Sequence, residues 1–292
     1  MERDILQKNF RIFIFLSIFI LILELFGSFL TNSLALLSDS GHVLVDVLAL
    51  GIAYFAMHMS KKKANHKFTY GYYRTEIFAA IINGVVLLAI TFYIFYEAYQ
   101  RLSVPQPVEG YEMLVVAIIG LLGNLYVLIK MHGHEKENLN VRGAYLHVLT
   151  DMLSSVGVVT AGILIIVTGN YIFDPIISII IGIIILIGSI SLLRESMDIL
   201  MEATPKNINI QKLTKDMHKV RGVKEIHDLH VWSISSDIYA LSSHVLIDAK
   251  NVKSMNRILK ALNEMLETKY KITHTVLQSE CKSCVDESKK KH

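Results

Sequence analysis

The sequence contains little charge and few cysteines. Only 19% of its 292 residues are charged while 52% are hydrophobic, and this balance is too apolar for an ordinary soluble protein of that length. The two cysteines, Cys281 and Cys284, form a single C-x-x-C pair in a hydrophilic tail, and one such pair does not staple a fold. The net charge of +3 is small, so we expect no nucleic-acid partner.

The N-terminal apolar run lacks the features of a cleavable signal. No small-residue cleavage site precedes Thr31, and Glu24 lies near the end of the run, so we expect a permanent membrane span there. Apolar runs of suitable length predict six spanning helices in contact with membrane lipid. Their expected ranges are 9–30, 34–59, 75–101, 111–131, 139–168 and 174–193.

The hydrophilic residues mark a second domain. Nearly half of the charged residues lie from Pro205 onward, so we expect an all-α transmembrane domain over residues 1–204 and a cytoplasmic domain over residues 205–292. Loops on the side of the termini carry nearly all of the loop Lys and Arg, and the opposite loops carry only Arg101, which places both termini in the cytoplasm. The expected helix-strand-strand-helix-strand order after residue 205 is compatible with a ferredoxin-like α+β domain.

Two of the predicted spans contain the same H-x-x-x-D motif. His42 and Asp46 lie in the second span, and His147 and Asp151 lie in the fifth. Residues four apart share one helix face, so two such helices facing each other would offer two nitrogens and two oxygens, which suit tetrahedral zinc. All four fall near the middle of an apolar layer about 30 Å thick, where a transport site is expected.

The alternative for a single buried His or Asp is a helix–helix hydrogen bond. Four such groups at a duplicated spacing favour a metal site instead, because intramembrane carboxylates are costly unless they are paired or functional. Asp39 lies on the same predicted face, one turn nearer the outer end, and is either an exit-path ligand or a helix cap.

With these motifs, the sequence resembles the cation diffusion facilitator family, especially its zinc-transporting branch. Shorter matches accompany the duplicated motif at residues 33–39, 70–76, 124, 174–175, 227–232 and 278–280. The resemblance implies a homodimer that exports zinc against protons, with zinc as substrate and regulatory ligand and with no cofactor. Many members carry a long His-rich loop between spans four and five, whereas this chain has only residues 132–138 there.

The resemblance also implies a cytoplasmic zinc site in the tail. The family positions that bind this zinc match His227, His244 and Glu280, and relatives differ in their use of the position of His274. Cys281 and Cys284 follow directly, and thiolates favour zinc, although a purely structural tail is the alternative for this pair.

Three other functions compete with zinc/proton antiport. The same fold could transport mainly cadmium, cobalt, iron or manganese, but two imidazoles argue against manganese. An intramembrane zinc hydrolase needs a general base beside an open metal position, and no H-E-x-x-H motif occurs. In a membrane-tethered metal sensor the buried tetrad would have no purpose. We therefore expect a non-enzymatic secondary transporter in a prokaryotic inner membrane.

Overall fold

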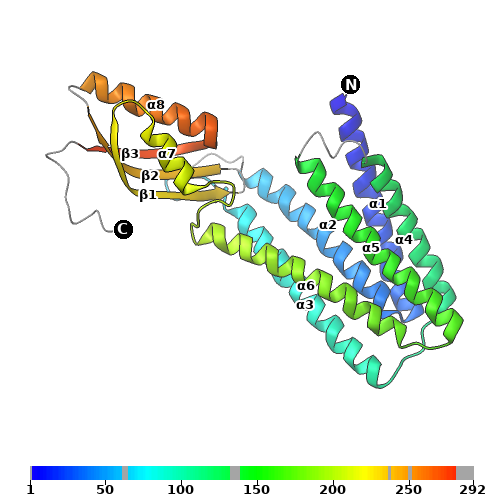
Figure 1. Cartoon of the computed structure of the whole chain (residues 1–292). Coiled ribbons are helices and arrows are strands. Elements are labelled where there is room, and N and C mark those ends of the chain that lie inside the picture. The colour runs from blue at the N-terminus through cyan, green and yellow to red at the C-terminus, as the bar shows by residue number, and fades with distance from the viewer. Residues whose placement is uncertain (1, 61–64, 132–138, 236–237, 249–251, 281–292) are drawn as a thin grey trace. The chain divides into compact units, whose positions relative to one another are not determined.

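The computed structural model describes the chain apart from residues 1, 61–64, 132–138, 236–237, 249–251 and 281–292 (Figure 1). The chain divides into two compact units. The first comprises Met1–Phe55 and Ala79–Leu193, and the second comprises Ala56–Phe78 and Arg194–His292. The predicted ligands Cys281 and Cys284 and the short loop at residues 132–138 lie outside the described residues.

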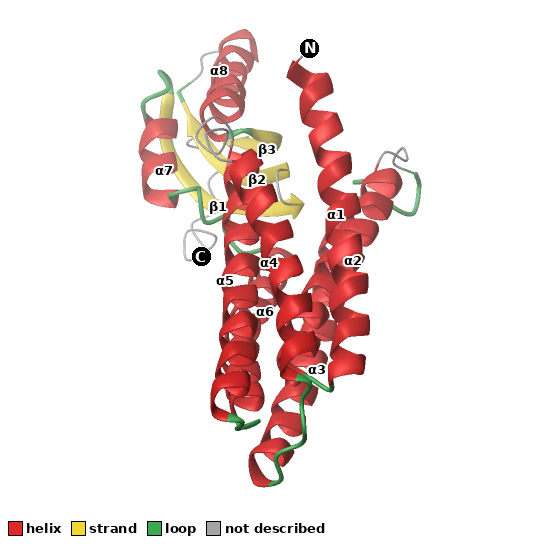
Figure 2. Ribbon diagram, turned by 90° about the vertical axis from the view of Figure 1, so that its right-hand side faces the viewer, coloured by secondary structure: helices red, strands yellow, loops and turns green. Residues whose placement is uncertain are grey.

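The first unit consists of long helices (Figure 2), and the ends of some of these helices belong to the second unit. They are α1 (Glu2–Thr31), α2 (Leu34–Ser60), α3 (Thr75–Ser103), α4 (Gly110–Met131), α5 (Leu139–Thr168) and α6 (Phe173–Leu200). Within the described residues, four helices are long and apolar enough to cross a membrane: Thr75–Ser103, Gly110–Lys130, Val148–Thr168 and Phe173–Leu200. The described side chains of α1 and α2 give shorter apolar segments, Phe15–Thr31 and Leu34–Val45.

The helices of the first unit pack closely through glycines. A Cβ at Gly27 of α1 would clash with Val116 of α4, and one at Gly182 of α6 would clash with Phe95 of α3. Small residues at such contacts let helix backbones approach each other, as is common in membrane proteins. Many large apolar side chains elsewhere on these helices face outward, which suits a lipid environment.

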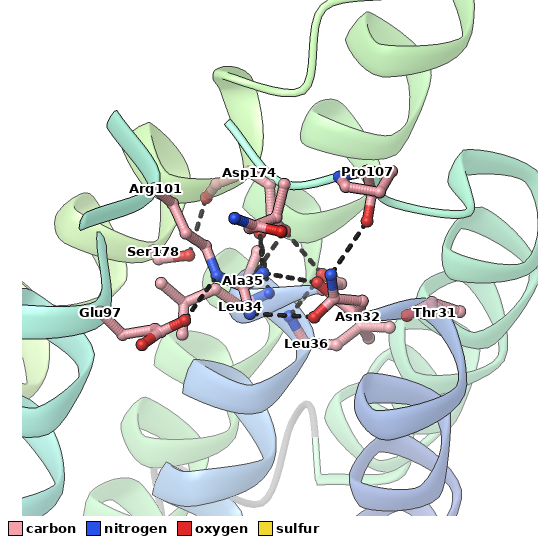
Figure 3. A network of polar contacts seen from close by, with 12 residues as sticks. Thr31, Asn32, Leu34, Ala35, Leu36, Glu97, Arg101, Pro107, Asp174 and Ser178 are labelled. Carbon is pink, nitrogen blue, oxygen red and sulfur yellow. Dashed lines mark hydrogen bonds and ion pairs between the residues drawn. The ribbon is translucent and has the colours of Figure 1, made fainter. Parts of the chain in front are cut away.

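A side chain from α6 caps the start of α2 (Figure 3). The carboxylate of Asp174 accepts hydrogen bonds from the backbone nitrogens of Leu34 (2.7 Å) and Ala35 (3.1 Å) and from the hydroxyl of Ser33 (2.7 Å). Arg101 of α3 lies 3.6 Å from the same carboxylate. Because the first N–H groups of a helix lack partners within the helix, this contact fixes the start of α2 against α3 and α6.

The second unit contains the sheet. Its elements after α6 are α7 (Ile210–His218), β1 (Val223–Ser235), β2 (Ile238–Ile247), α8 (Val252–Tyr270) and β3 (Ile272–Glu280), in the order expected from the sequence. The strands are arranged β1-β2-β3, with β1 antiparallel and β3 parallel to β2. Buried residues of both helices, including Leu213 and Leu262, pack with Leu241 and Val245 of β2 in one core.

Candidate metal centres

The helices α2 and α5 bring half of the predicted tetrad together. Nε2 of His42 lies 3.3 Å from Oδ1 of Asp151, and these side chains are only 14% and 13% exposed. One residue comes from each H-x-x-x-D motif, so the contact joins residues that the sequence places more than a hundred positions apart. It aligns an imidazole nitrogen and a carboxylate oxygen, both of which are ligands for zinc.

The other two members lie on the same helices. The helical backbone of α2 continues through Asp46 and that of α5 through His147, but their side chains lie outside the described part of the structure. Each is four residues from the described member of its own motif, which corresponds to about one helical turn. Their participation in the site therefore stays a prediction.

The segments that carry the motifs lie in the interior of the bundle. Val43 and Val45 of α2 and Val148 of α5 are buried, and Val45 belongs to the apolar core that these helices share. Gly41 of α2 also brings the backbone close to Ile90 of α3, where an added Cβ would be only 3.1 Å from a methyl group. The described polar side chains of the motifs, His42 and Asp151, therefore lie away from lipid.

Asp39 joins α2 to two further helices. Its side chain accepts a hydrogen bond of 3.0 Å from Ser155 of α5, and Ser155 accepts one of 3.2 Å from the amide of Asn124 of α4. Asp39 is only 2% exposed. Its carboxylate is thus part of a polar chain that runs beside the His42–Asp151 contact, while Asp174 caps the first turn of α2.

Glu24 is a buried acidic residue for which the sequence motifs predict no function. It lies in α1 and is only 1% exposed. An acidic residue inside a long apolar run is itself a signal of function, because such a residue is expensive within a membrane. The apolar sequence around Glu24 does not show which other helices lie against this carboxylate.

A second group of ligands lies on the sheet. One ring nitrogen of His227, one of His244 and one carboxylate oxygen of Glu280 lie within 4.8 Å of one another. Nδ1 of His244 lies 2.7 Å from Oε1 of Glu280, and Nε2 of His227 lies 3.2 Å from Oε2. Two nitrogens and one oxygen at this separation could hold zinc and leave a fourth coordination position for another ligand.

Strand pairing explains why these residues meet. His227 of β1 and His244 of β2 are directly opposite in the antiparallel ladder, with ring centroids 5.3 Å apart. Glu280 ends β3, which pairs with the other side of β2. Opposite residues on one face of a sheet have Cβ atoms about 5 Å apart, so the register alone places both imidazoles together.

Asp228 adds a second carboxylate beside this group. It has a positive φ of 51°, at an irregularity in the register of β1, and its Oδ2 lies 3.6 Å from Nε2 of His244. Its Oδ1 lies 3.0 Å from Nε2 of His230. This hydrogen bond, assisted by the charges of the neighbouring histidines, lowers the pKa of Asp228, so the group remains ionised at neutral pH.

His274 does not belong to the group of three among the described residues. It is exposed on β3, and its ring packs edge-on against that of Tyr70 with centroids 5.7 Å apart. Its use as a metal ligand stays a prediction, as does that of Cys281 and Cys284.

Comparisons with known proteins cover nearly the whole chain. The family model for the cation efflux transmembrane domain matches residues 10–201, and that for the cation efflux protein cytoplasmic domain matches residues 205–281. A cadmium, cobalt and zinc/H(+)-K(+) antiporter of Bacillus subtilis is 46% identical over 263 residues, which cover 89% of this chain and 84% of the relative.

Two further relatives come from other bacteria. The metal cation efflux system protein CzcD of Cupriavidus metallidurans is 39% identical, with 95% of this chain and 88% of the relative covered. The zinc transporter ZitB of Pectobacterium atrosepticum is 38% identical, with coverage of 91% and 83%. A solved structure, the metal-bound C-terminal domain of the CzcD transporter, is 34% identical over 25% of this chain and 99% of that chain, with a TM-score of 0.23.

Proposed function

The chain belongs to the cation efflux family, and we propose that it is a zinc/proton antiporter that removes zinc from the cytoplasm. The contact between His42 and Asp151 carries the proposal, because it joins the two H-x-x-x-D motifs inside the helical bundle. The names of the relatives support it, since they include a zinc transporter and a cadmium, cobalt and zinc antiporter.

In this proposal zinc is the substrate, and it is bound by His42, Asp46, His147 and Asp151. Zinc requires neutral imidazoles and ionised carboxylates, whereas protons compete for the same nitrogen and oxygen atoms. One site can therefore hold either cargo. Exposure of the site to alternate sides of the membrane would then exchange zinc for protons.

Zinc is the proposed main substrate, with cadmium and cobalt as the nearest competitors. The tetrad of two nitrogens and two oxygens suits zinc, and the name of the Bacillus subtilis relative includes cadmium and cobalt. Iron and manganese are the weaker alternatives, since manganese in particular favours sites with more oxygen ligands.

The proposed architecture has six spans per chain, with both termini in the cytoplasm of a bacterium and the spans in its inner membrane. The distribution of Lys and Arg supports this orientation. The cytoplasmic domain, residues 205–292, would be ferredoxin-like and would join two copies into a homodimer. The match to the family's cytoplasmic domain supports this part of the proposal.

The group formed by His227, His244 and Glu280 would bind regulatory zinc. Three ligand atoms within 4.8 Å support metal binding. Ligands on the sheet of a hydrophilic domain cannot themselves carry an ion across the membrane, so we assign them to sensing of the zinc level. Cys281 and Cys284 are proposed to assist, because thiolates favour zinc.

Zinc flux into proteoliposomes tests the proposed function. The purified chain would be reconstituted, a pH gradient imposed, and zinc uptake followed with a trapped fluorescent indicator. Uptake should follow the gradient and stop when an ionophore collapses it. Zinc uptake that is indifferent to the gradient would contradict proton coupling, and absence of uptake by folded protein would contradict zinc transport.

A further inference from the structure

The carboxyl group of Glu24 is inserted between α1 and α4. The side chain is 1% exposed, and Oε2 has no hydrogen-bond partner among the described residues. Gly120 of α4 makes the space for it, because a Cβ at this position would clash with Oε1 of Glu24. The carboxyl group therefore lies in a fitted position that is closed to water.

Glu24 lies close to the polar chain that runs beside the metal centre. Asn124 follows Gly120 by one turn of α4, and it begins the hydrogen-bonded chain through Ser155 to Asp39. Ser155 in turn lies one turn from Asp151 on α5. Four helices, α1, α4, α5 and α2, thus contribute to one buried polar region.

Among the residues that the structure describes, the charged and titratable neighbours of Glu24 come from two helices. The charge on Glu24 interacts with those on Asp39 of α2 and Asp151 of α5, and Asp39 interacts with His42. The α4 residues Gly120 and Asn124 are neutral. No Lys or Arg among the described residues is paired with Glu24, so no fixed positive charge compensates its ionised form.

We propose that Glu24 is a proton-binding residue that loses its proton when a divalent metal occupies the α2–α5 centre and regains one when the metal leaves. An unpaired carboxylate buried among other carboxylates is costly, so the empty centre favours the acid form. A divalent cation adds two positive charges to the same region and favours the ionised form. This inference rests on the proposed zinc/proton exchange, and it adds a proton carrier that is not a metal ligand.

Counting the protons released on zinc binding tests this role. Zinc would be added to the full-length protein in weakly buffered detergent solution, with a pH indicator for released protons and calorimetry for bound zinc. Glu24→Gln keeps the size of the side chain beside Gly120 but removes the titration. The variant should release about one proton fewer per bound zinc than the wild type. For each pH unit, the rise in its zinc affinity should therefore be about tenfold smaller than in the wild type.

The control is Glu112→Gln, which changes an exposed acidic residue on α4 and should leave the proton count unchanged. The sheet group has the same residues in all three proteins, so its contribution to the proton count cancels in the comparison. If wild-type protein binds zinc and releases no protons, the proposed zinc/proton exchange fails. If it releases protons and Glu24→Gln releases as many per zinc, only the assignment of Glu24 fails.

A measurement on the unchanged protein covers the case in which the variant does not fold. Hydrophobic carbodiimides modify buried carboxyl groups in their acid form, and peptide mass spectrometry locates the label. Glu24 should be labelled in the metal-free protein and protected by zinc. Absence of label on Glu24, or labelling that zinc does not change, would overturn the proposal.

Discussion

His42 and Asp151 offer different ligand atoms to a bound metal. The imidazole supplies a nitrogen ligand of intermediate softness, whereas the carboxylate supplies a hard oxygen. Their separation of 3.3 Å across two helices means that a substitution at His42 changes the donor set directly opposite an unchanged carboxylate. Metal selectivity is therefore the property that this position should control.

We predict that His42→Asp broadens the range of transported metals towards cadmium and manganese more than it lowers total transport. A carboxylate in place of the imidazole adds an oxygen ligand and loosens the geometry of the site. Competition of each metal with zinc uptake would measure the change. His218→Asp, at an exposed position on α7, is the matched control. An unchanged metal preference in His42→Asp would contradict selectivity by the tetrad.

Among the contacts between helices, the Asp174 side chain caps the start of α2. We predict that Asp174→Ala destabilises the protein by about 1–2 kcal/mol, because two backbone N–H groups of α2 and the hydroxyl of Ser33 lose their acceptor. Thermal unfolding followed by far-UV circular dichroism would measure the loss. Asp198→Asn, at an exposed position of the same helix, should be neutral. An equal midpoint for Asp174→Ala and wild type would show that the cap contributes little.

A second polar contact joins α7 to the end of α8. Asp216 accepts hydrogen bonds from Lys219 (2.8 Å), Tyr270 (2.7 Å) and Lys269. These bonds lower the pKa of Asp216, whereas desolvation and the bond to Asp216 raise the pKa of Tyr270 to about 12. A lowered carboxyl pKa in the folded state contributes stability above the unfolded value of about 3.9, and that contribution is lost as the pH falls below it.

We therefore predict that Asp216→Asn lowers the unfolding midpoint of this unit at pH 7 and that the difference from wild type shrinks below about pH 4. The only tryptophan of the chain is Trp232 on β1, so its fluorescence reports on this unit. Asp248→Asn is the control, because the ion pair of Asp248 with Lys224 is exposed and should contribute little. A pH-independent difference for Asp216→Asn would contradict the assignment.

Local sequence patterns predicted which helices and strands are present more accurately than the residues at which they begin and end. Hydropathy indicated α3 to within two residues, whereas α1 begins at Glu2 and the predicted range began at residue 9. The polar residues before that range can form helix, but they carry no hydropathy signal. The order of helices and strands after residue 205 was predicted because alternating and helical periodicities are both clear there.

The contacts between elements were harder to predict. The i, i+4 spacing predicts that each helix offers a His and an Asp on one face, but the 3.3 Å contact between His42 and Asp151 depends on how α2 packs on α5. Likewise, Asp174 lies about 140 positions from the N–H groups it caps, and Glu24 fits only because position 120 is glycine. Such contacts are set by tertiary packing, so no local pattern contains them.

At the scale of the whole molecule, the two metal centres would have separate tasks. We predict that replacing His227, His244 and Glu280 together with alanine weakens the response of transport to rising zinc or the stability of the dimer, while zinc/proton exchange persists. Zinc binding by this group should also weaken in acid, because protons compete with zinc for the imidazole nitrogens. Flux measured over a zinc titration, with light scattering for oligomeric state, would test this. Complete loss of zinc/proton exchange in a folded triple variant would contradict separate roles for the two metal centres.

In the proposed function, zinc crosses the membrane through the α2–α5 centre. The most direct measurement compares zinc flux into proteoliposomes for wild type, Asp151→Ala and Asp46→Ala, with Glu112→Gln as an exposed acidic control. Equal reconstitution and unchanged circular dichroism would establish that all four proteins are folded and inserted. Either change in the centre should abolish zinc flux, while the control should transport normally. Near-normal flux through Asp151→Ala or Asp46→Ala would contradict it.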